Sequence, residues 1–277
     1  MKFKYIIKDD TKVSDFLTIK GFSRKALIKL KKEGIMINGI KARTDQFINK
    51  GDLLEITLPN EESDIIPIDK PIEIIYEDEY ILCVNKPHNL AIIGTKRHYD
   101  NNLSSFIYSY FIKNNIASTV HLINRLDKNT SGIVLVAKSA YIHHLFKNIE
   151  IKKKYYCLVH GILDEGIIEK NIIKANDGTI KRKIDSLGKY AKTQYKVIYS
   201  NNNKSILDVT LHTGRTHQIR LHLSSIGHPI YGDDLYGESD GTLLLQSYYM
   251  EFIHPITNKH IILKLDIDKD IKMKGEM

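Results

Sequence analysis

The sequence predicts an α+β protein, in which a small α+β domain precedes a larger domain with a mixed, mostly antiparallel sheet and flanking helices. Three observations support this fold class. Of the 277 residues 42% are hydrophobic, enough for a sizeable core. Strand-like and helix-like segments follow in an irregular order, which disfavours a regular βαβ sheet. The acidic, Pro-containing segment 59–70 predicts a linker between domains 1–58 and 71–277.

The first domain should contain two short helices, a hairpin and a strand. Ser14 and Ser23 are the expected N-caps of the helices, and Gly21 and Gly34 are the expected stops. Asn38-Gly39 predicts a type I′ turn, because both residues tolerate positive φ. The expected elements are helices over 13–21 and 23–34, a hairpin over 35–42 and a strand over 51–59.

The second domain should be rich in strands. Short runs of β-branched and aromatic residues bounded by turn residues predict the strands, and longer amphipathic runs predict the helices. The expected strands are a hairpin over 72–87 and single strands over 132–139, 153–161, 192–200, 205–214, 243–253 and 260–267. The expected helices are 101–115, 139–153 and 216–227.

Basic residues are concentrated at the front of the chain. Residues 1–60 carry 13 Lys and Arg against 7 Asp and Glu, and the whole chain has a net charge of +8. Basic blocks favour a polyanion partner, nucleic acid first. On the second helix Lys25, Lys29 and Lys32 share one face. This stripe is also compatible with a merely solvated helix face.

With the following hairpin, the basic helix is similar to the small RNA-binding domain of the S-four type, first seen in a ribosomal protein. The similarity covers roughly residues 12–58 and implies that Arg24, Lys25, Lys29 and Lys32 face RNA phosphates.

Several function classes lack their sequence signals. The N-terminal segment is charged and no apolar run reaches the roughly 18 residues of a membrane span, so we expect a cytoplasmic protein with no membrane partner. Neither phosphate-cradling glycine loop nor GxSxG is present. The 12 histidines lack ligand spacing, so we expect no metal site. Cys83 and Cys157 lie in apolar runs and should be buried free thiols.

One carboxylate stands at a loop-to-strand junction. In the segment NRLDKNTSG, Asp127 follows Arg125 by two residues and precedes an apolar strand, so both side chains should point the same way. Taken alone, Asp127 is also a good turn residue. Farther along the chain Arg220 lies among apolar residues, and a half-buried arginine needs a carboxylate partner.

Five motifs occur in a fixed order along the second domain. They are NRLDKNTSG (124–132), KKYYCLVHG (153–161), AKTQYKV (191–197), TGRTHQIRLHLSSIGHPIYGD (213–233) and FIHP (252–255). Together they resemble the RluA family of pseudouridine synthases over about residues 70–260. Two departures stand out. Asn124 replaces the histidine of the first motif, and Thr242 and Gln246 replace the arginine and histidine of a later segment.

The resemblance implies isomerisation of uridine to pseudouridine in RNA, without cofactor or metal. It assigns catalysis to Asp127, Tyr155 and Arg220. Asp127 would attack the ribose as a nucleophile or deprotonate it, and the sequence leaves both routes open. Arg220 would be its counter-ion, and Tyr155 would stack on the uracil after the base leaves its stack.

Further residues are implied in substrate binding. Arg125 would fill the space left by the flipped base or hold the strand, Leu245 would pack under the base, and Arg215 and His217 would touch the RNA backbone. The implied substrate-binding set is Arg125, Asn124, Arg215, His217, Leu245 and Thr130.

The substrate and two rival functions stay open. Ribosomal RNA is favoured over transfer RNA, and we expect a monomer. One rival is an inactive RNA-binding or ribosome-assembly factor with the same fold. The other is a nucleoside or glycan hydrolase, for which Asp233 and Asp234 are the candidate second carboxylates.

Overall fold

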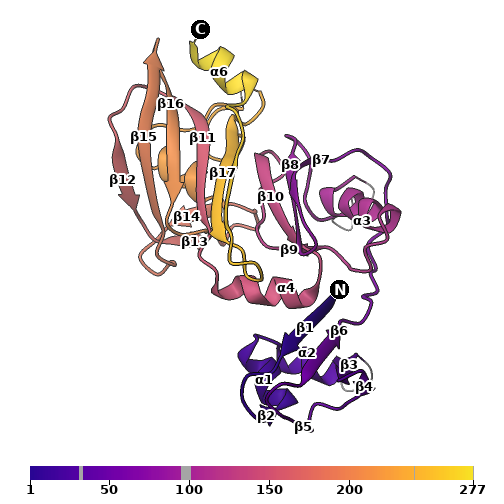
Figure 1. Cartoon of the computed structure of the whole chain (residues 1–277). Coiled ribbons are helices and arrows are strands. Elements are labelled where there is room, and N and C mark those ends of the chain that lie inside the picture. The colour runs from indigo at the N-terminus through magenta and orange to yellow at the C-terminus, as the bar shows by residue number, and fades with distance from the viewer. Residues whose placement is uncertain (31–33, 95–100, 240, 277) are drawn as a thin grey trace.

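The structure is a computed structural model that describes residues 1–30, 34–94, 101–239 and 241–276. We refer to residues 1–58 as the front unit and to the remaining described residues as the main unit (Figure 1). The front unit contains β1 (Lys2–Ile6), β2 (Thr11–Lys12), α1 (Val13–Ile19), α2 (Arg24–Leu30), β3 (Ile35–Ile37), β4 (Ile40–Lys41), β5 (Phe47–Ile48) and β6 (Leu53–Thr57).

The front unit is built on a small sheet of strand order β1-β6-β3-β4. The predicted turn between β3 and β4 is confirmed, since Asn38 and Gly39 have φ values of 50° and 78°. Strand β1 is not predicted from the sequence. It alternates exposed Lys2 and Lys4 with buried Phe3, and it pairs antiparallel with β6.

The two predicted N-caps have different outcomes. Ser23 is confirmed, because its Oγ accepts a hydrogen bond from the Ala26 N–H at 3.2 Å. The prediction that Ser14 is the N-cap is wrong, because α1 begins one residue earlier, at Val13, and has no side-chain cap. The N–H groups of Val13 and Ser14 instead donate to carbonyls of the 44–46 loop, which satisfies the helix start without a cap.

The main unit confirms the predicted large, mostly antiparallel sheet. Within the described residues ten strands join it, in the order β12-β15-β16-β11-β17-β10-β8-β7, with β18 on β17 and β9 on β10 (Figure 1). These strands are β7 (Glu73–Glu77), β8 (Ile81–Lys86), β9 (His121–Leu122), β10 (Ser131–Ala137), β11 (Lys152–His160), β12 (Gly166–Glu169), β15 (Lys192–Asn201), β16 (Lys204–Leu211), β17 (Leu245–Ile253) and β18 (His260–Lys264).

Helices and a second strand pair surround this sheet. They are α3 (Leu103–Lys113), α4 (Ala140–Leu145), the 3₁₀ turn η1 (Phe146–Asn148), β13 (Ile172–Lys174), β14 (Arg182–Ile184), α5 (Gln218–Ser224) and α6 (Lys269–Glu276). The three helices predicted in this unit are found at α3, α4 and α5, whereas α6 and β12–β14 are not predicted. The helix predicted over 139–153 is shorter, because β11 already begins at Lys152.

A short parallel joint divides the main sheet. Strands β10 and β17 pair only at Ser131–Gln246 and Gly132–Ser247, and all other pairs in the sheet are antiparallel. Gly132 has a φ of +110°, and a Cβ there would lie 2.1 Å from the Ser247 carbonyl oxygen. Only glycine fits this approach. Beyond the joint β10 and β17 diverge (Figure 1).

The front unit packs against the main unit near α4 (Figure 1). The rings of Phe22 and Tyr141 stack with centroids 4.0 Å apart, and the Tyr141 hydroxyl donates to the Lys20 carbonyl at 2.7 Å. Glu61 accepts a hydrogen bond from the first N–H of α4, at Ala140, at 2.8 Å and contacts His121 through its other oxygen. One continuous hydrophobic core therefore spans both units.

The two cysteines lie in the core of the main unit. Cys83 and Cys157 are buried and free, as predicted. Among the described residues no helix is long and apolar enough to cross a membrane.

Candidate active site

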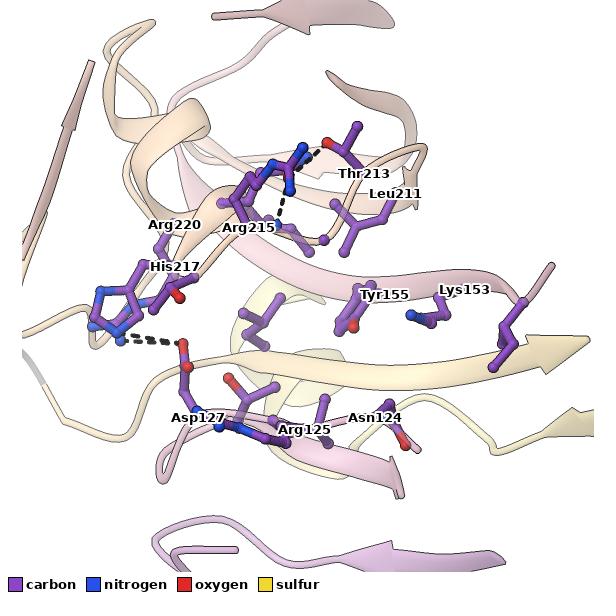
Figure 2. Close-up of a pocket in the computed structure, with 18 of the residues that line it drawn as sticks. Asn124, Arg125, Asp127, Lys153, Tyr155, Leu211, Thr213, Arg215, His217 and Arg220 are labelled. Carbon is purple, nitrogen blue, oxygen red and sulfur yellow. Dashed lines mark hydrogen bonds and ion pairs between the residues drawn. The ribbon is translucent and has the colours of Figure 1, made fainter. Parts of the chain in front are cut away.

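A cavity of about 610 Å³ lies beside the β10–β17 joint (Figure 2). Three stretches of the chain line it: the loop before β10, the start of β11, and the β16–α5 connection, joined by Leu245 at the start of β17. The predicted residues that line it are Asn124, Arg125, Asp127, Thr130, Tyr155, Arg215, His217, Arg220 and Leu245. Sequence segments far apart therefore converge on one cavity.

The carboxylate of Asp127 faces two basic groups across this cavity. Its Oδ2 lies 3.8 Å from Arg220 Nη1 and 3.8 Å from His217 Nε2 (Figure 2). The turn after it uses the main chain, because the Thr130 N–H donates to the Asp127 carbonyl at 3.1 Å. The side chain, 32% exposed, accepts no hydrogen bond from any described residue. The turn chemistry therefore leaves the carboxylate free.

Arg220 has a closer carboxylate partner than the sequence suggests. From α5 its Nε and Nη2 donate to Asp233 at 2.9 and 2.6 Å, and Nη2 also donates to Asp234 at 2.8 Å. The expectation that Asp127 is its main counter-ion is thus corrected. Asp233 is fully buried and also accepts the N–H groups of Leu235 and Tyr236, so it is the fixed partner.

Charge pairing keeps this network ionised. Burial alone would lower the pKa of Arg220, but the Asp233 carboxylate outweighs burial and the pKa is raised. Burial alone would raise the pKa of Asp233, but the Arg220 guanidinium outweighs it and the pKa is lowered. Asp233 therefore stays a carboxylate near neutral pH and cannot donate a proton. The hydrolase hypothesis, which needs a second catalytic acid there, therefore loses one of its two candidates, Asp233.

His217 occupies a strained position at the start of α5. It is the N-cap with a φ of 57°, in the left-handed region that costs a non-glycine residue energy. Its Nδ1 lies 3.0 Å from the Tyr236 hydroxyl, which turns Nε2 toward Asp127. Burial lowers the pKa of His217. The imidazole is therefore neutral near pH 7 and does not compete with Arg220 for the carboxylate.

Tyr155 and Leu245 form the apolar wall. Both are buried, at 6% and 4% exposure. Burial raises the pKa of Tyr155 to about 12, so its phenol stays protonated at neutral pH. Its neighbour Tyr156 stacks on Tyr248 on the other face, with ring centroids 3.6 Å apart, which confirms the predicted alternation along β11.

The remaining predicted residues differ in how they meet the cavity. Asn124 is buried and uses its amide on β10, donating to the Ile133 carbonyl at 3.0 Å and accepting from the Leu135 N–H at 2.8 Å. It therefore fixes the loop that carries Arg125, which is exposed. Thr130 is buried, and Arg215 donates from Nε to the Tyr190 carbonyl at 3.1 Å.

Two lysines were not predicted from the sequence. Lys153 lines the cavity next to Tyr155 on β11, and the same two-residue period that placed Tyr155 could have found it. Lys86 is fully buried under the loop, where its Nζ donates at 2.9 Å to the carbonyls of Pro87, Leu90 and Lys128. It holds the residue that follows Asp127. Burial lowers the pKa of Lys86 to about 7 despite the opposing charge of Asp127.

The basic residues of the front unit lie apart from this cavity. Arg24, Lys25 and Lys29 are exposed on α2, and Lys32 lies outside the described residues. Lys25 and Lys29 line a second cavity of about 470 Å³ between the front unit and α4. In the part of the chain that is described, no group of three or more His, Cys, Asp or Glu could hold a metal ion.

Comparison with known proteins gives a consistent result. A family model described as RNA pseudouridylate synthase matches residues 80–225. The chain is similar to an uncharacterized RNA pseudouridine synthase of Bacillus subtilis, YjbO, with 34% identity over 92% of this chain and 96% of the relative. It is also similar to the ribosomal large subunit pseudouridine synthase D of Zymomonas mobilis, with 32% identity over 92% of this chain and 89% of the relative.

Solved structures share the fold. The human protein described as RNA pseudouridylate synthase domain containing 4 gives a TM-score of 0.59 at 20% identity, over 72% of this chain and 90% of that protein. The human protein described as RNA pseudouridylate synthase domain containing 1 gives a TM-score of 0.58 at 24% identity, over 74% of this chain and 86% of that protein. At these identities the match concerns the fold alone.

Proposed function

This chain belongs to the RNA pseudouridylate synthase family, and on that premise we propose that it converts specific uridines of structured ribosomal RNA to pseudouridine with Asp127 as the catalytic carboxylate. Members of this family are isomerases that act on RNA. The target class rests on the relatives named for the large ribosomal subunit. The proposal includes a monomeric cytoplasmic enzyme that needs no cofactor and no metal.

One observation supports the assignment of Asp127 above all others. Its carboxylate lines the cavity, accepts no hydrogen bond from the described residues, and lies 3.8 Å from a guanidinium that Asp233 holds in place. A carboxylate that only capped a turn would accept hydrogen bonds from nearby N–H groups. The Asp127 carboxylate instead remains available to a ligand that enters the cavity.

The proposed reaction begins when the target base leaves its stack and enters the cavity. The uracil lies between Tyr155 and Leu245, and the ribose lies at Asp127. The bond from C1′ to N1 breaks, the uracil turns, and a bond from C1′ to C5 forms. N1 gains a proton and C5 loses one, so atoms balance without a redox step.

Asp127 has two routes available. It attacks C1′ and forms a covalent sugar ester, or it removes the C2′ proton and gives a glycal. Its carboxylate is free for either. Tyr155 is protonated at neutral pH, so its hydroxyl acts late in the reaction as a relay, which accepts the C5 proton as it gives its own proton to N1. Arg125, exposed at the cavity, occupies the gap left by the base or holds the displaced strand.

The front unit is proposed as an RNA-binding domain of the S-four type. The exposed cations Arg24, Lys25 and Lys29 on α2 support this, as does the confirmed hairpin that follows them. Such a surface binds phosphates and recognises RNA by shape, which suits capture of a folded RNA before one uridine is extruded.

Hydrogen release from uracil tests the proposal. The purified protein is incubated with ribosomal RNA and transfer RNA transcripts that carry tritium at C5 of uracil. We expect tritium release from ribosomal RNA, no free uracil, and no release with Asp127→Asn. Release only from transfer RNA would change the substrate class. Free uracil would indicate a hydrolase, and no release from any RNA would favour the inactive binding factor.

A further inference from the structure

Three consecutive lysines begin β11, and among the described residues the first and the third have a carboxylate partner whereas the middle one has none. Lys152 Nζ lies 3.4 Å from Glu251, and Lys154 Nζ lies 3.2 Å from Asp208. Lys153 forms no hydrogen bond or ion pair with any described residue. Because side chains alternate along a strand, Lys153 shares the face of Tyr155 and lines the cavity (Figure 2). The flanking lysines lie on the opposite face.

The surroundings of Lys153 are apolar. Its register partner on β16 is Leu211, its register partner on β17 is Met250, and Ile151, two residues before it, also lines the cavity. Burial lowers the pKa of Lys153. A half-buried ammonium without a counter-charge is unfavourable. An anion that enters from outside would relieve this cost, as Glu251 and Asp208 do for its neighbours.

The position of Lys153 limits which anion this can be. It lies about 6.6 Å from Tyr155 along the strand, as two residues of an extended chain require. Figure 2 shows it on the far side of Tyr155 from Asp127, so RNA backbone that extends in this direction from a base stacked on Tyr155 would pass the Lys153 ammonium. RNA offers one kind of anion, the phosphate diester.

We propose that Lys153 binds the backbone phosphate of a nucleotide adjacent to the target uridine and so sets the position of the strand across the cavity. This inference rests on the proposed function and goes beyond it by assigning a phosphate subsite. Lys153 is a positioning residue here, since it does not touch the reacting atoms. The contact forms when RNA binds and persists during the reaction, so its loss should raise KM more than it lowers kcat.

The test uses an RNA hairpin that contains the mapped uridine, and binding is measured in an Asp127→Asn background to avoid turnover. Lys153→Met should weaken binding about 10-fold and lower the slope of log K against log salt by about 0.7 to 0.9. In the active protein it should raise KM about 10-fold and leave kcat within about 2-fold. Lys153→Arg should retain most affinity, and Lys152→Met, on the opposite face, should change little.

A neutral backbone linkage in the RNA provides a second test, which combines a change in the RNA with the change in the protein. A methylphosphonate at one linkage beside the uridine should cost the unsubstituted protein about the same factor as Lys153→Met, and should cost the Lys153→Met protein nothing further. The inference alone would be overturned if the methylphosphonate lowered the RNA affinity of both proteins equally at every linkage. It would also be overturned if Lys153→Met left the slope of log K against log salt unchanged while pseudouridine still formed. Absence of pseudouridine with the unsubstituted protein would overturn the proposed function and the inference together.

Discussion

Arg220 Nη1 lies 3.8 Å from Asp127 Oδ2, although a different carboxylate holds the guanidinium. Asp233 and Asp234 take the Nε and Nη2 groups, and Nη1 remains directed at Asp127. This division explains how a buried arginine can serve a reactive group. It is stabilised by a partner that does not react, so Asp127 can change its charge or form a bond without releasing the arginine.

Removal of the buried partner should therefore harm both stability and activity. Asp233→Asn removes the fully buried partner of the Arg220 guanidinium and leaves only the more exposed Asp234 and Asp127 near it among the described residues, so we expect the free energy of unfolding to fall by about 3 to 5 kcal/mol. Urea denaturation measures this. Asp234→Asn is the matched control, because Asp234 is half exposed, and should cost at most about 1 kcal/mol. Equal losses of stability in the two variants would contradict the conclusion that Asp233, and not Asp234, is the main partner of Arg220.

The hydroxyl of Tyr155 should matter for turnover more than for binding. Tyr155→Phe keeps the ring, so RNA affinity should stay within about 3-fold, whereas product formation should slow about 100-fold if the hydroxyl moves a proton. Single-turnover kinetics separates the two quantities. Tyr156→Phe alters the neighbouring ring on the other face of the sheet and should react normally. Normal turnover by Tyr155→Phe would leave the ring with a stacking role only.

His217 should make stability depend on pH. Its folded-state pKa is lowered from an ordinary value of 6.5, so the unfolded chain binds the proton first as pH falls. The stability linked to His217 is thus present above pH 6.5 and is lost as pH falls below it. Urea denaturation from pH 7.5 to 5 should show the unsubstituted protein losing stability relative to His217→Gln. If the difference in free energy of unfolding between the two proteins stayed constant from pH 7.5 to 5, the lowered pKa of His217 would be contradicted.

Neutral substitutions on α2 should weaken RNA binding uniformly. Lys25→Ala with Lys29→Ala removes two exposed cations, and the slope of log K against log salt should fall by about 1.4 to 1.8 if both contact phosphates. Lys8→Ala with Lys50→Ala changes two other exposed lysines of the front unit and is the control. Equal losses in the two double variants would mean that only net charge matters.

Local signals predicted local structure well. The Asn38-Gly39 turn, the Ser23 cap and the alternation at Tyr155 are each fixed by residues next to one another, and all three are confirmed. Ser14 failed because the loop at 44–46 satisfies the start of α1 through the backbone, and no local pattern encodes that contact. Strand β1 likewise depends on β6, from the far end of the front unit.

The site could be predicted as a set of residues but not as a network. The motif order brought Asp127, Tyr155 and Arg220 together, and the cavity contains all three. The pairing of Arg220 with Asp233 could not be read from spacing, because two acids and Asp127 all satisfied the need for a carboxylate. Lys153 was not predicted, although the two-residue alternation places it on the face of Tyr155, because alternation alone does not show which lysine of a run becomes buried.

The most direct test maps pseudouridines at single-nucleotide resolution in the ribosomal RNA of cells that lack this protein, after return of the unsubstituted, Asp127→Asn or Asp164→Asn protein. Asp164 is an exposed carboxylate outside the cavity and serves as control. We expect the unsubstituted and Asp164→Asn proteins to restore the same missing sites and folded, RNA-binding Asp127→Asn protein to restore none. Restoration by Asp127→Asn would contradict the assignment of Asp127 as the catalytic carboxylate.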